Sequence, residues 1–307
     1  MLAIAQIRQP VINLDEAGRK AIVDATAGLL REGYVDIEKG QMTADVIQAA
    51  LADGSFDAID EPQAFAERLT EDMHAVAHDE HLRFIGPREP RPDPSKGVTR
   101  ADILDGNVGY LQVDAFRQSE QFGQAVNQIM EAFAETRALI IDVRENTGGQ
   151  GTAGLVTYFV DSSMPVHIHT VMRRIEGTDT FDSTEIWTTP APLVYDKPVY
   201  ILTSSRTFSA GEAFAYQMQA MNSATIVGET TRGGGHNGGT RQLAPGFMLF
   251  LPIGRGVNPI TGTNWEGIGV IPDISSSSAD ALKVALNELG VSGDSIDIEA
   301  LSVSRVF

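Results

Sequence analysis

A proline-rich segment divides this sequence into two parts with different patterns. The stretch 87-PREPRPDPSKG-97 holds four prolines in eleven residues. Because proline fixes φ and lacks a backbone N–H, this stretch cannot form a regular helix or a central strand. We therefore predict a linker over 87–105, which joins a helical domain, 1–86, to a larger domain, 106–307.

The first domain has the apolar spacing of amphipathic helices. Asp15 is placed to cap the first helix. Met42, Val46, Ala50 and Leu51 mark a second helix. The segment 60-DEPQ-63 has the cap at Asp60, the early proline and the glutamine that open a third. Three such helices with short connections predict a small bundle.

The second domain mixes strand and helix patterns. The run 138-ALIIDV-143 is continuously apolar, as expected of a buried strand. Further strand patterns lie at 108–116, 166–171, 198–203, 224–227 and 247–251, and helical patterns lie at 119–136, 209–221 and 279–289. The predicted fold class is α/β (α+β), with an N-terminal helical bundle before a mixed core.

The composition narrows the possible partners and cofactors. The net charge is −18, from 41 acidic and 23 basic residues, so nucleic acid and anionic membrane surfaces are not expected partners. No apolar run reaches the length of a membrane-spanning helix, and we expect no stable membrane insertion. The absence of cysteine excludes disulfides, thiol catalysis and thiolate metal sites. We expect no cofactor and no metal, and the sequence sets no oligomeric state.

The N-terminus leaves the compartment open. The start MLAIAQ lacks a basic region and a full apolar region, so it is not itself a signal peptide. Ala3-Ile4-Ala5 before Gln6 has the small-residue form of a cleavage site, by chance or as the remnant of a trimmed export signal. In the second case a periplasmic or secreted protein is favoured, and otherwise a cytoplasmic one.

Ser209 is the first candidate for chemistry. It follows the expected strand 198–203 and opens a helix, where unpaired backbone N–H groups and the helix dipole favour a developing oxyanion. The alternative is an ordinary N-cap serine. Ser204, Ser205 and Thr207 fit the preceding turn and need no catalytic role.

Two glycine-rich loops follow expected strands. In 142-DVRENTGGQG-151, the N–H groups of Gly148 and Gly149 are placed to form one wall of an oxyanion hole, or the segment is only a tight turn. The spacing is not that of a phosphate-binding loop.

The second loop, 228-GETTRGGGHNGG-239, is expected to face a ligand. Gly234 and His236 are its candidate substrate-binding residues, and His236 is also a competing base.

A serine nucleophile needs a base, which is usually histidine. The segment 78-HDEHL-82 closes the third helix, and His78 and His81 share one face if that helix persists. Solvated histidines at a helix end are the alternative, and no third ligand accompanies the pair at metal-site spacing. Glu266, in 264-NWEGIGVIPDI-274, is placed to orient a distant base or to pair with an arginine.

Six segments, in order, resemble the tail-specific protease and tricorn-core serine peptidase clan. Within that clan, the sequence is most similar to the module of interphotoreceptor retinoid-binding protein and its bacterial peptidase relatives. The matching segments are 65-FAERLTEDMHAVAHDEHL-82, 107-NVGYLQVDAF-116, 140-IIDVRENTGG-149, 202-LTSSRTFSAGEAFAY-216, 226-IVGETTRGGGHNGG-239 and 266-EGIGVIPD-273.

The resemblance implies a ββα-spiral core like that of Clp protease and crotonase. It implies Ser209 as nucleophile, with an oxyanion hole made by the Ala210 N–H and a glycine N–H from Gly148 or Gly149. Tail-specific proteases insert a PDZ domain before the core, and the short segment between the two domains here leaves no room for one.

The clan uses two kinds of base. The lysine of classical tail-specific proteases is absent, because no lysine lies between Lys197 and Lys283. The tricorn type uses a histidine and a late glutamate, which His81 and Glu266 match, although Glu80 stands where that type has a serine.

The resemblance thus implies a serine peptidase that cleaves a peptide or protein substrate through an acyl-enzyme, with its active site in the cleft between the domains. A different class of function remains as the alternative. On that reading the protein is a non-catalytic binder of a lipophilic ligand, such as a retinoid or a fatty acid.

Overall fold

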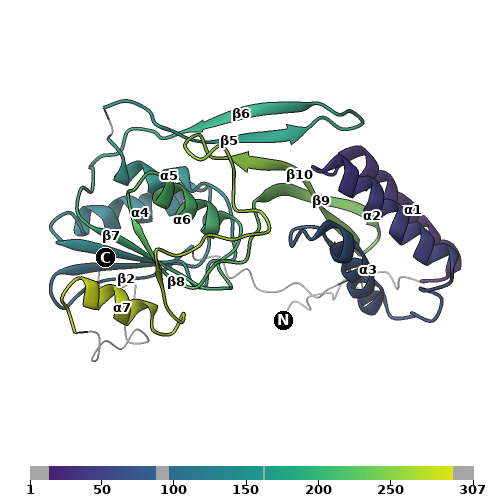
Figure 1. The fold of residues 1–307 in the computed structure, drawn as a ribbon, viewed down its shortest axis with the longest axis horizontal. Coiled ribbons are helices and arrows are strands. Elements are labelled where there is room, and N and C mark those ends of the chain that lie inside the picture. The colour runs from purple at the N-terminus through teal and green to yellow at the C-terminus, as the bar shows by residue number, and fades with distance from the viewer. Residues whose placement is uncertain (1–13, 88–96, 162, 293–307) are drawn as a thin grey trace, which may run out of the picture. The chain divides into compact units, whose positions relative to one another are not determined.

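The computed structural model describes residues 14–87, 97–161 and 163–292 of the 307-residue chain (Figure 1). The expected cleavage pattern at 3–6 and most of the proline segment lie outside the described residues. The chain forms two compact units. The first comprises Met1–Pro92, Arg173–Asp182 and His236–Arg255, and the second comprises Asp93–Met172, Ser183–Gly235 and Gly256–Phe307.

The first unit begins with the three expected helices, α1 (Glu16–Gly33), α2 (Ile37–Ala52) and α3 (Pro62–Ala77). Asp15 caps α1 as predicted, because its Oδ1 accepts the Gly18 N–H at 2.8 Å. The predicted cap of α3 at Asp60 is wrong by one residue. Glu61 is the N-cap, since the proline directly after it supplies the helical φ of the first turn.

α2 is the predicted second helix, but two of the residues that indicated it are exposed. Met42 is 51% exposed and Val46 is 42% exposed. The buried residues of this helix are Gly40, Thr43, Ala44 and Ile47. The last turn of α1 lies close to α2, so that a Cβ on Gly40 would lie only 2.6 Å from the Leu30 carbonyl oxygen. Close approach through small residues therefore decided which face is buried.

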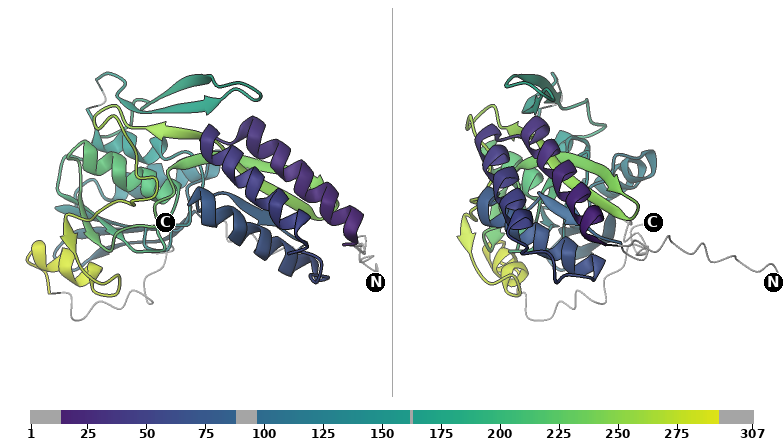
Figure 2. Two further views of the ribbon diagram at one scale, coloured as in Figure 1. Left: turned by 45° about the vertical axis from the view of Figure 1, so that its right-hand side comes forward. Right: turned by 90° about the vertical axis from the view of Figure 1, so that its right-hand side faces the viewer.

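Strands from a distant part of the sequence complete the first unit. β1 (Arg83–Ile85) pairs antiparallel with β10 (Phe247–Val257), which also pairs with β9 (His236–Ala244). The sheet order is β1-β10-β5-β6, and the tip of the hairpin formed by β5 (His167–Arg174) and β6 (Phe181–Trp187) belongs to this unit. Figure 2 shows the three helices beside β9 and β10.

The core of the first unit joins its helices to its strands. Phe65 of α3 packs edge-on against Phe84 of β1 and against Phe247 of β10. All three rings are almost completely buried. Burial of aromatic rings from segments so far apart in sequence is a main source of the unit's stability.

The second unit contains a six-stranded sheet in the order β11-β8-β7-β4-β3-β2. Its strands are β2 (Val98–Leu104), β3 (Val108–Val113), β4 (Ala138–Asp142), β7 (Val199–Thr203), β8 (Thr225–Gly228) and β11 (Ile274–Ser275). All neighbouring strands are parallel except β2 and β3. The predicted buried strand is β4, at the centre of this sheet. β2 lies within the range expected to be linker.

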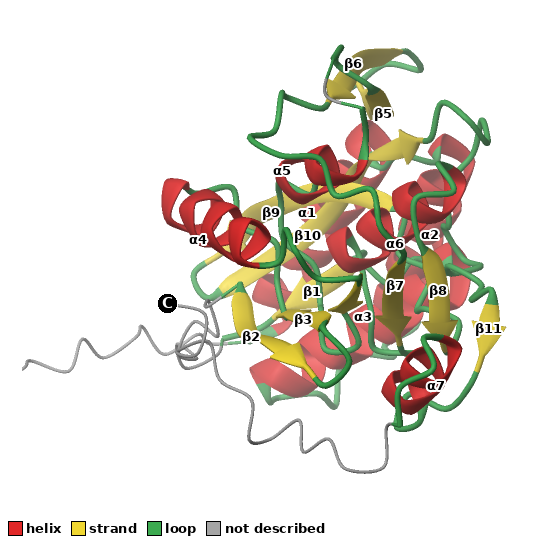
Figure 3. Ribbon diagram, turned by 90° about the vertical axis from the view of Figure 1, so that its left-hand side faces the viewer, coloured by secondary structure: helices red, strands yellow, loops and turns green. Residues whose placement is uncertain are grey.

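Alternate residues of this sheet enter different cores. Leu111, Ile141 and Ile201 face a core that includes side chains of α4 (Glu120–Ala132) and α6 (Ala210–Ala220). Their neighbours Tyr110 and Ile140 face a core that includes side chains of α7 (Ala281–Glu288). Two further short helices are α5 (Ala153–Val156) and the 3-10 helix Thr157–Phe159. The sheet is therefore buried on both faces, and α7 lies on the face opposite α6 (Figure 3).

The structure confirms a mixed α/β fold with helices at its N-terminal side. Between α3 and β3, the described residues form β1 and β2. In the described part of the chain, no helix combines the length and the apolar character needed to cross a bilayer.

Candidate functional site

Ser209 occupies a strained turn in the second unit, between β7 and α6. Its backbone angles are φ 55° and ψ −114°, outside the regions that non-glycine residues usually adopt. The residue is half-buried, and α6 begins at the next residue, Ala210. Strain of this kind persists only where the surrounding structure enforces it, and it is concentrated at functional sites.

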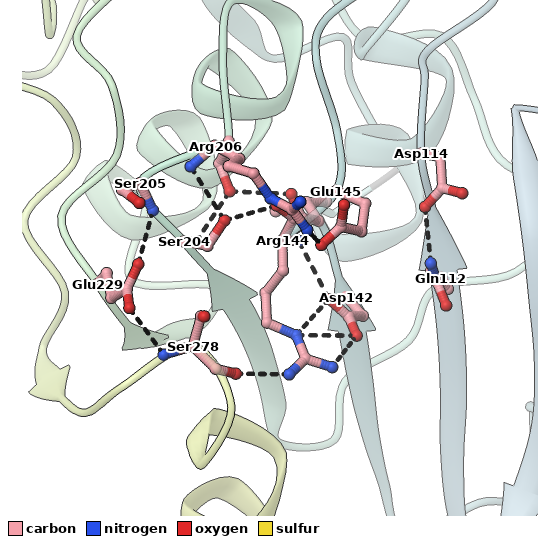
Figure 4. Close-up of polar contacts among 12 residues, drawn as sticks. Gln112, Asp114, Asp142, Arg144, Glu145, Ser204, Ser205, Arg206, Glu229 and Ser278 are labelled. Carbon is pink, nitrogen blue, oxygen red and sulfur yellow. Dashed lines mark hydrogen bonds and ion pairs between the residues drawn. The ribbon is translucent and has the colours of Figure 1, made fainter. Parts of the chain in front are cut away.

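Side-chain and backbone hydrogen bonds fix the turn that carries Ser209. They tie residues 204–208 to the segment after β4. The bonds run from Ser204 Oγ to Arg144 O (2.6 Å), from Thr207 Oγ1 to Val143 O (2.9 Å) and from the Phe208 N–H to Asn146 O (2.9 Å). Figure 4 shows Ser204 beside Arg144. The hydroxyls of Ser204 and Thr207 thus have structural partners in this turn.

Gly148 lies directly against Ser209. A Cβ on Gly148 would be 3.0 Å from Ser209 Cβ and 3.4 Å from Ser209 Oγ, and its φ of +122° also requires glycine. Its N–H is already bonded to Asn146 Oδ1, at 2.9 Å. Within the described residues, the N–H groups of Gly149 and Ala210 have no hydrogen-bond partner. The structure thus brings Ser209, Ala210 and the glycine pair together.

Glu212 ties the turn to the second glycine-rich loop. Its side chain is completely buried, and it accepts four hydrogen bonds. The donors are the N–H groups of Ser209 (2.8 Å), Gly233 (2.6 Å) and Gly234 (2.9 Å) and the hydroxyl of Thr231 (2.6 Å). Burial raises the pKa of Glu212, and these hydrogen bonds offset part of that rise. Glu212 therefore fixes the backbone of the candidate nucleophile and the loop at once.

Glu266 belongs to the second unit and lies against the same loop. Its Oε2 accepts the Gly235 N–H at 2.6 Å. The neighbouring Trp265 donates its Nε1–H to Gly234 O, at 2.8 Å. Gly234, a predicted substrate-binding residue, thus has both its N–H and its carbonyl in internal hydrogen bonds.

His81 and His236 meet at one buried carboxylate in the first unit. Asp79 Oδ2 lies 2.8 Å from the ring nitrogen Nδ1 of His236. Asp79 Oδ1 accepts a hydrogen bond from the backbone N–H of His81, also at 2.8 Å. The hydroxyl of Tyr34 donates to Oδ2, also at 2.8 Å. Burial raises the pKa of Asp79, but the hydrogen bond and charge of His236, with the bonds from His81 and Tyr34, outweigh burial and leave this pKa below 3.8.

The structure decides two points about the histidines that the sequence leaves open. α3 ends at Ala77, and His78 is its C-cap in the left-handed conformation (φ 52°), so His78 and His81 do not share a helix face. His81 is also not solvated, since it is only 4% exposed and stacks on Phe250 with ring centroids 5.7 Å apart.

A polar pocket of about 480 Å³ also lies in the second unit. Its lining residues are Arg100, Gln112, Asp142, Arg144, Glu145, Ser278 and Ala279. Arg144 Nη2 pairs with Asp142 Oδ2 at 2.6 Å, and Arg144 Nη1 donates to Ser278 O at 2.6 Å (Figure 4). These charges stabilise the segment after β4 from the α7 face of the sheet, opposite the α6 face.

Sequence reasoning missed Glu212, Asn146 and Asp79. Glu212 had a readable signal, because Ser209-Ala-Gly-Glu212 has the spacing of a capping box. Asp79 stands in the histidine segment 78–82. Nothing local in the sequence indicates that its partner is His236, 157 residues away.

Comparison with known proteins identifies the family. Residues 107–276, more than half of the chain, match the model of peptidase family S41. A CtpA-like serine protease of Staphylococcus epidermidis is 29% identical over 178 residues, which are 56% of this chain and 34% of the relative. The chloroplastic carboxyl-terminal-processing peptidase 2 of Arabidopsis thaliana is 26% identical over 170 residues, 54% of this chain and 31% of the relative. The chain spans about a third of the length of these relatives.

Solved structures agree in fold. The photosystem II D1 C-terminal processing protease has a TM-score of 0.56 at 14% identity, over 85% of this chain and 93% of that one. The tricorn protease has a TM-score of 0.55 at 14% identity, over 89% of this chain and 37% of that one. The fold is thus that of the tail-specific and tricorn-type proteases. By its sequence, the chain belongs to peptidase family S41.

Proposed function

We propose that this protein is a serine peptidase that hydrolyses peptide bonds, with Ser209 as nucleophile. The observation that carries the proposal is the strained backbone of Ser209 at the start of α6, held against Gly148. Family membership supports peptide or protein substrates. The Ser209 oxygen bonds to the scissile carbonyl carbon, and the C–N bond breaks as the amine half of the peptide leaves with the proton taken from the serine. Water then hydrolyses the acyl-enzyme, which releases the carboxyl half and restores the Ser209 hydroxyl.

The oxyanion hole in this proposal is formed by the N–H groups of Ala210 and Gly149. Both lack a hydrogen-bond partner among the described residues, whereas the Gly148 N–H already donates to Asn146. Gly148 then acts through its missing side chain, because a Cβ would crowd Ser209. Two such donors stabilise the negative charge that develops on the carbonyl oxygen of the substrate.

His81 is proposed as the base that takes the Ser209 proton, and Glu266 as the carboxylate that orients it. The backbone N–H of His81 donates to Asp79, and the His81 ring stacks on Phe250. Glu266 is held by the Gly235 N–H. His81 belongs to the first unit and Glu266 to the second, so the proposal requires both units for activity.

Peptide hydrolysis by the purified chain tests this function. Ser209→Ala is expected to lower kcat by about a thousandfold or more, with an unchanged melting temperature. Ser205→Ala is the matched control, because Ser205 is exposed and lies in the same turn. That variant is expected to keep its activity. Hydrolysis by Ser209→Ala at the wild-type rate would overturn the proposal.

A further inference from the structure

Gly149 uses only one edge of its backbone within the second unit. The Phe116 N–H donates to Gly148 O at 2.9 Å, and the Gln150 N–H donates to Phe116 O at 3.0 Å. These two bonds make a parallel bridge between Phe116 and Gly149. A residue at the centre of such a bridge turns its own N–H and C=O toward the opposite edge. Neither group of Gly149 has a hydrogen-bond partner among the residues that the structure describes.

The order of the strands places this open edge on the side of Ser209. Phe116 follows β3 and Gly149 follows β4, so their bridge continues the pairing of these two strands. The other neighbour of β4 is β7, which leads into the Ser209 turn. Gly148 is buried against Ser209, whereas Gly149 is exposed. The edge is therefore covered by the Ser209 turn at Gly148 and open to solvent at Gly149.

We propose that the substrate pairs with this edge as an antiparallel strand, through the residue that supplies the scissile carbonyl. The carbonyl oxygen of this acyl residue accepts the Gly149 N–H, and its own N–H donates to the Gly149 carbonyl oxygen. The inference rests on the proposed peptidase function and deepens it, because it adds the Gly149 carbonyl as a binding group. It also fixes the conformation of the substrate, since such a pair forms only with an extended chain. The expected substrates are therefore unfolded segments of polypeptide.

The two steps of the reaction favour the antiparallel direction. An antiparallel pair of this kind engages both the N–H and the C=O of one substrate residue, whereas a parallel pair engages the residues on either side of it. In the parallel case, the Gly149 carbonyl would bind the N–H of the second residue after the acyl residue, which departs with the amine half. Antiparallel pairing instead holds the acyl residue against Gly149 until water has released it.

Peptide substrates with one amide replaced by an ester test this register. The ester removes a single N–H and keeps the length and the side chains of the peptide. Removal of the N–H of the acyl residue should lower kcat/KM about tenfold. Removal of the N–H one residue earlier is the control, because that group points to the other edge, and it should change kcat/KM by less than about twofold.

Two results of this comparison would overturn the inference. One is an equal kcat/KM for the amide and for the ester at the acyl residue. The other is a loss that appears only when the N–H of the second residue after the acyl residue is removed, because that pattern belongs to parallel pairing. Mass spectrometry of the products confirms that each substrate is cleaved at its scissile amide.

The substitution Gln150→Pro links the effect to Gly149. Proline removes the N–H that bonds to Phe116 O, so the edge of Gly149 is no longer held in place. The tenfold penalty of the ester at the acyl residue should then fall below about threefold. Gln150→Ala keeps this N–H and should keep the penalty. A full penalty in Gln150→Pro would overturn the inference.

A spectroscopic measurement on the wild-type chain decides the question if Gln150→Pro does not fold. The chain carries ¹³C in its glycine carbonyls and ¹⁵N in its glutamines, and Gln150→Ala assigns the resonance of the Gly149–Gln150 peptide bond. Modification of Ser209 by a peptide phosphonate should shift the Gly149 carbonyl resonance. The analogue with an ester in place of the N–H at the acyl residue should shift it less. Equal shifts would overturn the inference.

Failure of this inference is distinct from failure of the proposed function. Hydrolysis by Ser209→Ala at the wild-type rate would refute Ser209 as the nucleophile. Equal cleavage of the amide and ester substrates by a chain that Ser209→Ala inactivates would refute the strand pairing alone.

Discussion

Glu212 and Asp79 are both buried carboxylates, but their partners differ in kind. Glu212, in the second unit, accepts three backbone N–H groups and one hydroxyl, all of them neutral. Asp79, in the first unit, accepts one backbone N–H, a tyrosine hydroxyl and a histidine ring. Burial raises the pKa of Glu212, whereas the His236 partner leaves the pKa of Asp79 lowered despite its burial.

This difference separates two tasks. Neutral backbone donors make Glu212 a fixed bridge between the Ser209 turn and the glycine loop, with no partner that can take a proton. Asp79 instead fixes a titratable ring, so it can set a tautomer. Acid also acts on them in opposite directions. Protonation favours the folded state at Glu212, whereas the stability that Asp79 contributes is lost as the pH falls below 3.8 through its folded pKa.

The largest expected effect comes from removing the Glu212 bridge. Glu212→Ala leaves four buried donors without an acceptor and should destabilise the second unit by about 4 kcal/mol. Glu229→Ala is the matched control, because Glu229 accepts the N–H groups of Ser205 and Ser278 but is only partly buried. It should cost about 1 kcal/mol or less. Urea unfolding measures both. Equal losses of unfolding free energy in Glu212→Ala and Glu229→Ala would contradict the role of Glu212 as a stabilising bridge.

A partly buried histidine makes the stability of the second unit sensitive to acid. His169 Nδ1 lies 2.8 Å from Gln217 Nε2, and burial, with a smaller contribution from His167, lowers the pKa of His169 from 6.5 to about 4. The unfolded chain binds more protons between these values. Stability should therefore fall by up to about 3 kcal/mol as the pH drops from 6.5 to 4.

Urea unfolding between pH 7 and pH 4 tests this prediction. His169→Gln should remove most of the pH dependence in that window. An equal dependence of the unfolding free energy on pH in the wild type and in His169→Gln would contradict the assignment of this effect to His169.

The contact between Gly148 and Ser209 predicts a smaller loss. Gly148→Ala places a Cβ 3.0 Å from Ser209 Cβ and forces a residue with a side chain to adopt φ +122°. The expected cost is about 2 kcal/mol, with loss of peptide hydrolysis. Gly154→Ala, in α5, meets no atom within 4 Å and should be neutral or slightly stabilising. Thermal unfolding and an activity assay compare the two variants. Full activity in Gly148→Ala would contradict the proposed contact between Gly148 and Ser209.

The smallest effect concerns the Tyr34 hydroxyl. Tyr34→Phe removes one hydrogen bond to Asp79 and should destabilise the first unit by about 1 kcal/mol. Chemical denaturation measures this loss. A loss above about 3 kcal/mol would mean that Tyr34, rather than His236, is the principal partner of Asp79.

The sequence predicts much of the local structure. Asp15 caps α1, the run at 138–143 forms a central buried strand, and Ser209 stands at a helix start, as their patterns indicate. Each of these depends on neighbouring residues alone. The mixed α/β fold and the family also follow from the order of the motifs.

What the sequence does not predict depends on distant partners. Met42 and Val46 have helical spacing but are exposed, because close packing through Gly40 determines the buried face. The return of the glycine loop to Glu212 and the pairing of Asp79 with His236 span 19 to 157 residues. Such contacts arise only when separate elements pack together.

The position of the reactive serine tests the central claim most directly. A serine-directed phosphonate that carries an affinity tag is incubated with the folded chain, and mass spectrometry of the digested protein locates the adduct. The account predicts a single modified residue, Ser209, and no adduct in Ser209→Ala. Modification of another serine of the turn at the wild-type rate, or hydrolysis of peptides by a chain whose Ser209 is fully blocked, would contradict it.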